Sequence, residues 1–309
     1  MPVLGLDTSN YTTSAALFDG ARGNNIGRLL DVRPGELGLR QSDALFQHVK
    51  RLPELLEQLL AAETDLQAVG ASTRPRAVEG SYMPCFLAGE SLGRGIATAL
   101  GVPFYAHSHQ QGHLAAAAWS AGRLDLLERP FLAWHLSGGT TELLLVRPEG
   151  TSVAAEIIGG TSDLSAGQLI DRTGMILGLR FPAGRALDEL CAQADICCEP
   201  QVKLRDLTFS LSGMENQVKA LAEKGENPAN IACFAIDAVS NVVWRATQEA
   251  QRRYPGLPVL YSGGVASNSR LRSRLAPVGA VFAQPQYSTD NAMGTAVLTW
   301  RAVWKEGKL

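Results

Sequence analysis

The sequence predicts an α/β protein built from two related α/β lobes. Strand and helix patterns alternate along the 309-residue chain, and a strand, a turn of small or hydroxyl residues and a second strand follow one another twice. A third strand of the same kind ends in a glycine pair and opens a helix. Such alternation is typical of sheets covered by helices. The length suits two domains, or one large duplicated fold, with a sizeable core.

The bulk composition is that of a globular protein. Hydrophobic residues make up 46% of the chain and charged residues 19%, and the net charge of -2 provides no general attraction to nucleic acid, so an RNA partner has to meet a local basic patch. We find neither a signal peptide nor an apolar run of membrane-spanning length, and expect a soluble, cytoplasmic protein without a membrane partner. Five cysteines without paired spacing indicate neither a disulfide framework nor a cysteine zinc site: Cys85, Cys191, Cys197, Cys198 and Cys233.

The turns between strands are rich in glycine, serine and threonine. Such turns expose backbone N–H groups that bind phosphate oxygens, although each one taken alone is equally consistent with a tight hairpin. Their repetition favours the duplicated actin-like ATPase and sugar-kinase fold, in which nucleotide binds in the cleft between two related α/β lobes. The turns follow the strands that begin at Val3, Phe131 and Pro258, and they contain Thr8-Ser9, Ser137-Gly-Gly-Thr-Thr141 and Ser262-Gly-Gly264.

The segments between the turns are predicted mainly as helices. Apolar residues at helical spacing predict a long amphipathic helix over residues 42–62, interrupted or kinked near Pro53. The next helix, 89–100, carries small residues that suit a close neighbour, and a short strand to residue 105 follows it. Further helices are predicted for residues 164–177, 185–194, 231–251 and 291–304.

We expect the lobes to divide near residue 105. The N-terminal lobe then comprises residues 1–105, and the C-terminal helix 291–309 returns to it. Residues 106–290 form the C-terminal lobe, which we expect to carry the metal and nucleotide sites.

Two histidines four residues apart provide the strongest chemical signal in the chain. His109 and His113 lie on one face of a predicted helix, one turn apart, where they can bind a single metal ion. Asp290, about 180 residues later, is a natural third ligand because a carboxylate at a helix start is held rigidly beside open space. The alternative is a chance spacing of the histidines, with Asp290 acting only as a helix cap.

Seven motifs follow one another between residues 109 and 291, and their joint pattern resembles the TsaD family of tRNA threonylcarbamoyltransferases, once misnamed O-sialoglycoprotein endopeptidases. The resemblance extends over nearly the whole chain. The resemblance is that of a divergent member. The motifs are His109-Gln-Gln-Gly-His113-Leu, Leu136-Ser-Gly-Gly-Thr-Thr-Glu142, Ala166-Gly-Gln-Leu-Ile-Asp171, Gly178-Leu-Arg-Phe-Pro-Ala-Gly184, Phe209-Ser-Leu-Ser-Gly213, Ser262-Gly-Gly-Val-Ala-Ser-Asn268 and Thr289-Asp290-Asn291.

The resemblance implies an activity and a set of site residues. The expected reaction moves a threonylcarbamoyl group from its adenylate to N6 of the tRNA adenosine beside the anticodon. His109, His113 and Asp290 are the implied ligands of one divalent metal ion, iron or zinc, which acts as a Lewis acid. The implied partners are tRNA, a TsaB-like protein of related fold and an accessory ATPase. The residues implied for the adenine nucleotide or threonylcarbamoyl adenylate are Leu136, Ser137, Gly138, Gly139, Thr140, Asp171, Gly184, Gly263, Gly264 and Asn268.

Several positions depart from the family pattern. Asn10, Tyr11 and Thr12 stand where the family carries an Asp-Glu pair, and Thr140 stands where it carries a histidine. The loop over residues 72–81 is longer and more basic than its family counterpart. These departures leave a second interpretation open. In that interpretation the chain is a non-catalytic or altered-specificity paralogue that binds metal and adenine nucleotide within a modification complex.

Two other enzyme classes are disfavoured. Zinc metalloproteases place a glutamate between the paired histidines as the general base, whereas Gln110, Gln111 and Gly112 lie between them here. A phosphotransferase shares the predicted fold but does not require a two-histidine metal site. Asp7 is a candidate for a water-mediated cation contact. The arginines at 74, 76, 270, 272 and 274 are candidates for contacts with tRNA phosphates, and a solvated basic face is the alternative for them.

Overall fold

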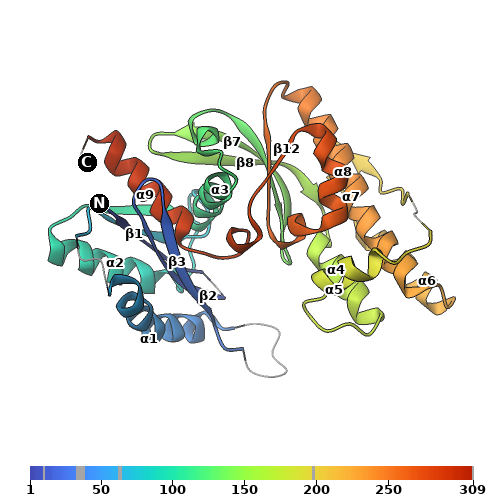
Figure 1. Cartoon of the computed structure of the whole chain (residues 1–309), viewed down its shortest axis with the longest axis horizontal. Helices are drawn as coiled ribbons and strands as arrows, with labels where there is room; N and C mark the ends of the chain where they lie inside the picture. Colours follow the sequence, from blue (N-terminus) through green and yellow to red (C-terminus); the bar gives the residue numbers. More distant parts are fainter. Residues whose placement is uncertain (10, 33–38, 62–64, 197–198, 308–309) are drawn as a thin grey trace. The chain divides into compact units, whose positions relative to one another are not determined.

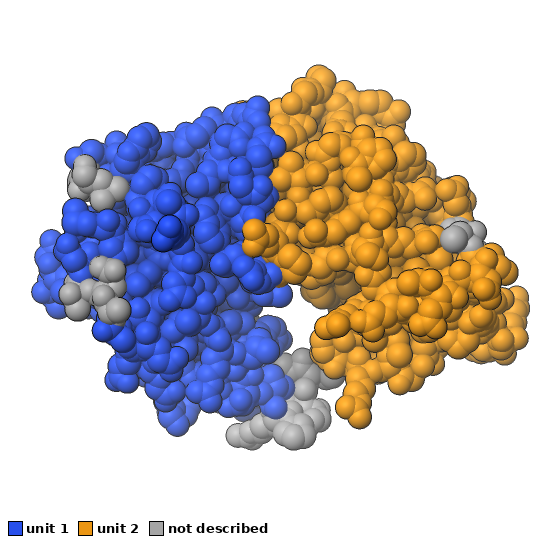
Figure 2. All heavy atoms as spheres, in the orientation of Figure 1, with its two compact units in different colours: residues 1–129, 147–155, 286–309 blue, residues 130–146, 156–285 orange. Residues whose placement is uncertain are grey.

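The computed structural model describes residues 1–9, 11–32, 39–61, 65–196 and 199–307. It divides into two compact units, coloured separately in Figure 2. Unit 1 holds residues 1–129, 147–155 and 286–309, and unit 2 holds residues 130–146 and 156–285. This division differs from the predicted one, because the two-histidine helix and Asp290 both fall in unit 1.

Unit 1 is organised around a five-stranded sheet of order β3-β2-β1-β4-β5. Figure 1 labels β1, β2 and β3 of this sheet. The first three strands are antiparallel, and β4 and β5 are parallel to β1. The strands are β1 (Val3–Thr8), β2 (Thr12–Phe18), β3 (Gly23–Leu29), β4 (Val69–Arg74) and β5 (Phe104–Ser108). The helices are α1 (Gln41–Leu60), α2 (Phe86–Leu100), α3 (His109–Ser120) and α9 (Met293–Lys305), together with the 3-10 turns η1 (Leu124–Glu128) and η4 (Pro285–Tyr287), the latter beginning one residue before the unit boundary.

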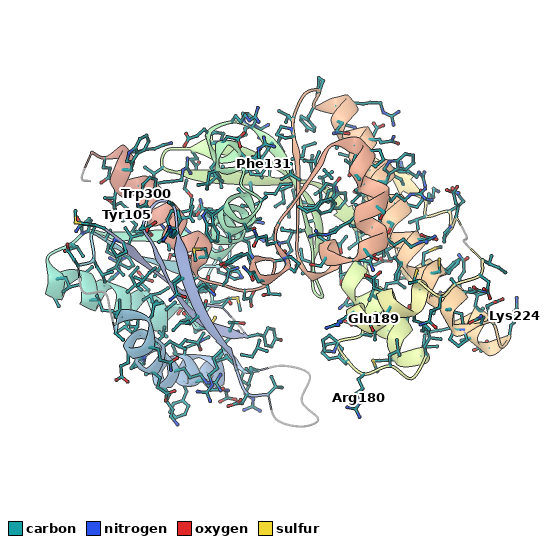
Figure 3. The ribbon with its side chains drawn as sticks, in the orientation of Figure 1. Tyr105, Phe131, Arg180, Glu189, Lys224 and Trp300 are labelled. Atoms are coloured by element: carbon teal, nitrogen blue, oxygen red, sulfur yellow. The ribbon has the colours of Figure 1, made fainter. Side chains whose placement is uncertain are left out.

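Helices cover both faces of the sheet in unit 1. Leu4 and Leu6 of β1 belong to a core cluster with residues of α1 and α2. Gly5 points to the opposite face, because side chains alternate along a strand, and it lies against α9. Trp300 of α9, labelled in Figure 3, packs edge-on against Phe18 of β2, with ring centroids 5.9 Å apart.

Unit 2 is organised around the seven-stranded sheet, of order β12-β11-β6-β7-β8-β10-β9, although residues 147–155, at the end of β7 and the start of β8, belong to unit 1. Its largest buried side chain, Trp134, donates from Nε1 to Thr247 Oγ1 at 2.9 Å and anchors the sheet to α7. The strands are β6 (Phe131–Leu136), β7 (Thr141–Glu149), β8 (Ser152–Thr161), β9 (Leu204–Arg205), β10 (Thr208–Phe209), β11 (Val259–Ser262) and β12 (Ala280–Phe282). The helices are α4 (Ala166–Ile176), α5 (Gly184–Cys191), α6 (Ser212–Glu223), α7 (Pro228–Arg253) and α8 (Ser269–Leu275), with the 3-10 turns η2 (Gly264–Ser267) and η3 (Ala276–Val278).

The two sheets repeat one arrangement of strands. β6 pairs antiparallel with β7 and parallel with β11, as β1 pairs antiparallel with β2 and parallel with β4. The orders β3-β2-β1-β4-β5 and β8-β7-β6-β11-β12 therefore correspond strand for strand. The two strand–turn–strand repeats of the sequence are the β1–β2 and β6–β7 hairpins, and the chain has a duplicated α/β architecture.

Glycines allow α9 to approach its neighbours in unit 1 closely. A Cβ atom placed on Gly294 would lie 2.5 Å from the carbonyl carbon of Gly112 and 2.8 Å from the nitrogen of Ala116, both in α3. A Cβ atom on Gly5 would lie 2.8 Å from the carbonyl oxygen of Ala292. Only glycine fits at these two positions, and the contacts fix where the segment before α9 meets α3.

Most predicted elements are present, with shifted ends. The helix predicted for 42–62 begins at Gln41 and runs through Pro53 without interruption, and its predicted end at residue 62 lies outside the described residues. The structure adds β3, β8, β9, β10, β12 and α6, which the sequence left unassigned. Within the described residues, no helix is long and apolar enough to cross a membrane.

Candidate metal centre and ligand cavity

The two histidines lie at the start of α3, where local sequence fixes the helix boundary. Ser108 accepts a hydrogen bond from the Gln111 nitrogen at 3.2 Å, and the Ser108 nitrogen donates to Gln111 Oε1 at 2.9 Å. This reciprocal capping places His109 as the first helical residue. His113 follows one turn later, so both imidazoles lie on the same face of α3.

Asp290 lies in the segment between η4 and α9, and its neighbour holds that segment in place. Asn291 donates to the Thr289 carbonyl oxygen at 2.7 Å and accepts from the Met293 nitrogen at 3.0 Å. Helix α9 begins at Met293 without a side-chain cap. Asp290 is therefore not a capping residue, which removes the alternative role considered for it from the sequence.

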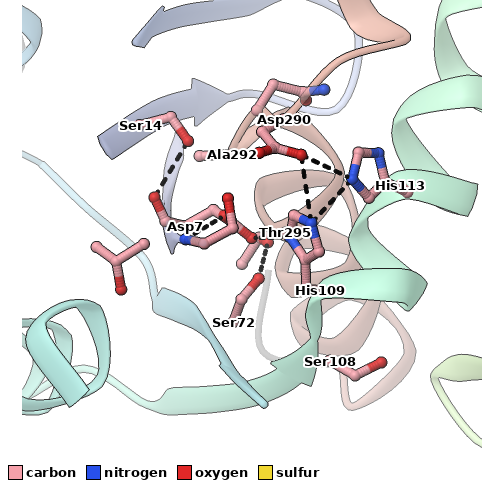
Figure 4. A network of polar contacts seen from close by, with 12 residues as sticks. Asp7, Ser14, Ser72, Ser108, His109, His113, Asp290, Ala292 and Thr295 are labelled. Carbon is pink, nitrogen blue, oxygen red and sulfur yellow. Dashed lines mark hydrogen bonds and ion pairs between the residues drawn. The ribbon is translucent and has the colours of Figure 1, made fainter. Parts of the chain in front are cut away.

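The structure brings the three predicted ligands together in unit 1 (Figure 4). The Nε2 atoms of His109 and His113 are 2.9 Å apart, and Asp290 Oδ1 lies 3.4 Å and 3.3 Å from them. Ligand atoms about 2.1 Å from a tetrahedral ion are roughly 3.4 Å apart, so the triangle fits a zinc-sized cation. The three side chains are 20%, 11% and 29% exposed, which leaves one side of the triangle open.

The charges around His109 oppose its burial. Burial lowers the pKa of His109, but the charge of Asp7, the hydrogen bonds from His109 to Asp290 and Asp7, and the charge of Asp290 outweigh it and raise the pKa to about 10. Burial likewise raises the pKa of Asp290, but hydrogen bonds and charges from His109 and His113 hold it well below its ordinary value. Both shifts show that the carboxylates of Asp7 and Asp290 favour positive charge at this place.

Unit 2 contains a cavity of about 530 Å³, within the size range of small-molecule sites. Its wall combines apolar side chains, two carboxylates, one arginine and backbone from two glycine turns. The residues are Gly138, Gly167, Ile170, Asp171, Phe181, Pro182, Gly184, Arg185, Asp188, Gly264, Val265, Ser267 and Asn268.

The glycines of the two turns serve different purposes. Gly263 has a φ of +94°, and a Cβ atom there would lie 2.5 Å from the carbonyl carbon of Leu136, so only glycine fits. Gly138, Gly139 and Gly264 have no positive φ, and a Cβ atom at each would meet nothing within 4 Å. Backbone geometry does not require glycine at these three positions, where the missing side chains leave open space beside the turns.

The carboxylates of the cavity wall also organise it. Asp171 of α4 accepts from the Ala183 nitrogen at 2.8 Å and so fixes the loop before α5. Asp188 of α5 accepts from the nitrogen and the hydroxyl of Ser269, both at 2.9 Å. Asn268 caps α8 by accepting from the Leu271 nitrogen at 2.9 Å. Polar groups from α4, α5 and α8 are therefore locked around one space.

Five residues predicted for nucleotide binding line this cavity: Gly138, Asp171, Gly184, Gly264 and Asn268. The other predicted residues lie in or behind the turns without lining it: Leu136, Ser137, Gly139, Thr140 and Gly263. The sequence missed Asp188 and Phe181. Asp188 lies one helical turn after Gly184 in α5, and Phe181, which is 73% exposed, begins the turn that ends in Gly184. The short distance of both residues from Gly184 in the sequence could have indicated that they line the same cavity.

The structure describes all but one of the substituted positions, that is, those where this sequence departs from the family pattern. Tyr11 is exposed and Thr12 is buried, while Asn10 lies outside the described residues. The nitrogen of Thr140 donates to Ser137 Oγ at 3.0 Å and closes the β6–β7 turn.

The arginines of α8 are engaged within the molecule. Arg270 forms a two-point ion pair with the buried Asp237, and Arg272 donates to the carbonyl oxygens of Ala266 and Ala283. Arg274 pairs with Glu199 at 3.2 Å. These bonds favour a structural role for the three arginines over both candidate roles, tRNA contacts and a solvated basic face.

Comparison with solved structures shows the fold. The chain matches full-length HypF in its phosphate- and nucleotide-bound form with a TM-score of 0.61 at 14% identity, over 97% of this chain and 46% of that one. It matches an activator of 2-hydroxyisocaproyl-CoA dehydratase from Clostridium difficile, with bound ADPNP, with a TM-score of 0.55 at 12% identity, over 100% and 97% of the two chains. A ROK family glucokinase from Streptomyces griseus gives a TM-score of 0.53 at 12% identity, over 97% and 100%. These matches confirm the actin-like ATPase and sugar-kinase fold.

Comparison with sequences shows the family. The model of TsaD, tRNA N6-adenosine threonylcarbamoyltransferase, matches residues 38–297. A tRNA N6-adenosine threonylcarbamoyltransferase of Thermus thermophilus is 33% identical, over 97% of this chain and 93% of its own length. One from Streptococcus pneumoniae is 33% identical, over 89% and 83% of the two lengths. The chain belongs to the TsaD family.

Proposed function

We propose that the chain transfers a threonylcarbamoyl group from its adenylate to N6 of the adenosine beside the anticodon in tRNA. The observation that carries the proposal is the triangle of His109, His113 and Asp290, assembled in a chain of the TsaD family. The relatives named above carry this activity in their names. The cavity of unit 2 supports it independently, because it provides the polar and apolar groups that an adenylate needs.

The reaction requires positioning more than covalent chemistry from the protein. The N6 amine attacks the carbamoyl carbon, an N–C bond forms, the bond from that carbon to the phosphate oxygen breaks, and AMP leaves. The amine loses one proton overall. The protein therefore has to hold two substrates in line and stabilise charge on the carbonyl and phosphate oxygens.

The residues of unit 1 suit a divalent cation, which we propose to be iron or zinc. Two imidazoles and one carboxylate match the donors that both ions take in enzymes, and the open side of the triangle leaves room for substrate oxygen. When bound, such an ion supplies positive charge that polarises carbonyl or phosphate oxygens. His109, His113 and Asp290 hold it, and the bonds of Ser108 and Asn291 keep these side chains in place.

The cavity of unit 2 is proposed to bind the adenylate. Asp171 and Asp188 offer carboxylate oxygens to ribose hydroxyls, and the open turns at Gly138 and Gly264 allow phosphate to approach the backbone closely. Asn268 contributes a side-chain amide at the same wall. The residues that line the cavity are therefore sufficient to bind the adenylate in this proposal.

We propose a TsaB-like protein of related fold as the protein partner. In unit 1, α1 exposes Phe46 and Val49, at 64% and 56%, and α2 exposes Leu87. Val49 and Leu87 line an apolar groove between α1 and α2, and exposed apolar surface of this kind marks protein interfaces. An accessory ATPase is proposed on the family resemblance alone.

A transfer assay tests the proposal. The purified chain, with and without a TsaB-like partner, is incubated with unmodified tRNA and synthetic threonylcarbamoyl adenylate, and nucleosides are quantified by mass spectrometry. We expect threonylcarbamoyladenosine from the wild type and from Glu223→Ala, an exposed change on α6. We expect none from the double variant His109→Ala/His113→Ala.

The same assay also tests the alternative function, that of a non-catalytic or altered-specificity paralogue. If the wild type binds zinc and AMP but forms no product with any partner, the transfer proposal fails. The non-catalytic or altered-specificity paralogue then replaces it. The next experiment then restores the family's residues at the positions that depart from its pattern. These are Tyr11 and Thr12, where the family has acids, and Thr140, where it has a histidine.

A further inference from the structure

Asp7 lies behind His109, on the side of the imidazole that faces away from the triangle. Its Oδ2 is 2.8 Å from His109 Nδ1, whereas His109 Nε2 faces His113 and Asp290 (Figure 4). The two ring nitrogens point in different directions, so Asp7 cannot ligate an ion bound at Nε2. Asp7 is also only 1% exposed, which separates it from the solvent-facing ligands.

We propose that Asp7 is a positioning residue for the metal centre: it accepts the Nδ1–H of His109 and thereby aims Nε2 at the ion. The inference rests on the proposed metal site, and it replaces the water-mediated cation contact considered for Asp7 from the sequence. A neutral imidazole has one protonated and one free nitrogen. Holding the proton on Nδ1 leaves the Nε2 lone pair available as a ligand.

Asp7 is itself fixed from several directions. The Ser9 nitrogen donates to its Oδ1 at 3.0 Å, and the Ser72 side chain hydrogen-bonds to it. Ser72 Oγ is in turn 3.1 Å from Thr295 Oγ1 on α9. The carboxylate is thereby connected to β1, β4, α3 and α9, so it cannot turn without breaking several buried bonds. Such a rigid acceptor determines the orientation of the ring that it contacts.

The network also explains why a carboxylate, and not an amide, suits this position. In an Asp7→Asn variant, the amide NH₂ would face either the Ser9 N–H donor or His109 Nδ1. The first orientation sets two donors against each other. The second requires Nδ1 to accept, which moves the ring proton to Nε2 and removes the ligand lone pair. Either orientation weakens metal binding.

Zinc titration against a chromophoric chelator tests the inference without tRNA or adenylate, so its result does not depend on transfer activity. We expect Asp7→Asn and Asp7→Ala to bind zinc about 10- to 100-fold more weakly than the wild type. The matched control is Ser14→Ala, because Ser14 donates only to the backbone oxygen of Asp7, at 3.2 Å, and we expect its zinc affinity to stay within about threefold. An Asp7→Asn variant that is folded, as judged by circular dichroism, and binds zinc as tightly as the wild type would overturn the inference.

A second measurement covers variants that do not fold. In the zinc-loaded wild type labelled with ¹⁵N-histidine, we expect one imidazole with a proton on Nδ1 that exchanges slowly with water and is lost in His109→Ala. A His109 ring whose Nδ1 carries no proton, or whose Nδ1 binds the zinc, overturns the inference. A wild type that binds no zinc removes both the metal site and the role of Asp7, whereas absent transfer with intact zinc binding leaves this inference standing.

Discussion

Replacing Gly294 with alanine tests whether the contact between α3 and α9 sets the metal triangle. The new Cβ atom would lie 2.5 Å from the Gly112 carbonyl carbon and 2.8 Å from the Ala116 nitrogen, whereas an ordinary contact needs 3.4 Å. Both obstacles are backbone, so no side chain can turn aside. Helix α9 therefore has to recede from α3 by roughly one ångström, and overpacking of this kind costs about 1–3 kcal/mol.

The same shift moves the segment that carries Asp290, which precedes α9 directly. We therefore expect Gly294→Ala to lower both the free energy of unfolding and the zinc affinity. The matched control is Gly95→Ala, in the exposed part of α2, where a Cβ atom meets nothing within 4 Å. Alanine is the better helix former, so we expect this control to stabilise the protein by about 0.5–1 kcal/mol and to leave zinc binding unchanged.

Urea unfolding followed by circular dichroism measures the first effect on metal-free protein, and chelator competition measures the second. If Gly294→Ala matches the wild type in both measurements, the close approach of α3 and α9 does not set the triangle. If it lowers stability but not zinc affinity, the contact stabilises unit 1 without positioning Asp290.

Three further predictions concern single side chains. His113→Ala should lose stoichiometric zinc, measured by inductively coupled plasma mass spectrometry, while Glu223→Ala retains it; full metal content in the first contradicts the triangle. Burial lowers the pKa of His48 from 6.5 to about 4, so the unfolded chain binds more protons between these values. Stability should therefore fall by up to about 3 kcal/mol as the pH drops from 6.5 to 4. Urea unfolding of His48→Gln should show a shallower pH dependence, and an unchanged slope would exclude His48 as its source. Asn268→Ala should cost about 1 kcal/mol through loss of the α8 cap and weaken AMP binding in calorimetry; equal affinity contradicts the cavity assignment.

Local patterns in the sequence predicted the parts of the fold that local physics determines. Apolar runs that lead into small and hydroxyl residues identified the central strands, and helical spacing identified α1. β3 was missed because its sequence, Gly-Asn-Asn-Ile-Gly-Arg-Leu, lacks the alternation of a half-buried strand and forms only by pairing with β2 at the sheet edge. The interruption predicted as one possibility at Pro53 is absent, because a long helix packed against its sheet tolerates one lost backbone hydrogen bond.

The candidate site likewise has a part that the sequence predicts and a part that it does not. The four-residue spacing of His109 and His113 is a local property, so the sequence was sufficient to predict their shared face. Long-range contacts were not predictable from spacing. The bond from Asp7 to His109 joins residues 102 positions apart, and the boundary at residue 129 follows from the packing of α3 against α9. Sequence alone does not reveal which distant backbone segments touch.

Unit 1 is discontinuous, and this has a consequence for when the metal centre can form during synthesis. The histidines are translated before residue 120, but Asp290 and α9 follow only after all of unit 2. While unit 2 is being synthesised, the nascent chain can offer an ion only the two imidazoles. Selective metal loading therefore has to wait until residue 290 and α9 have been translated and have packed against α3.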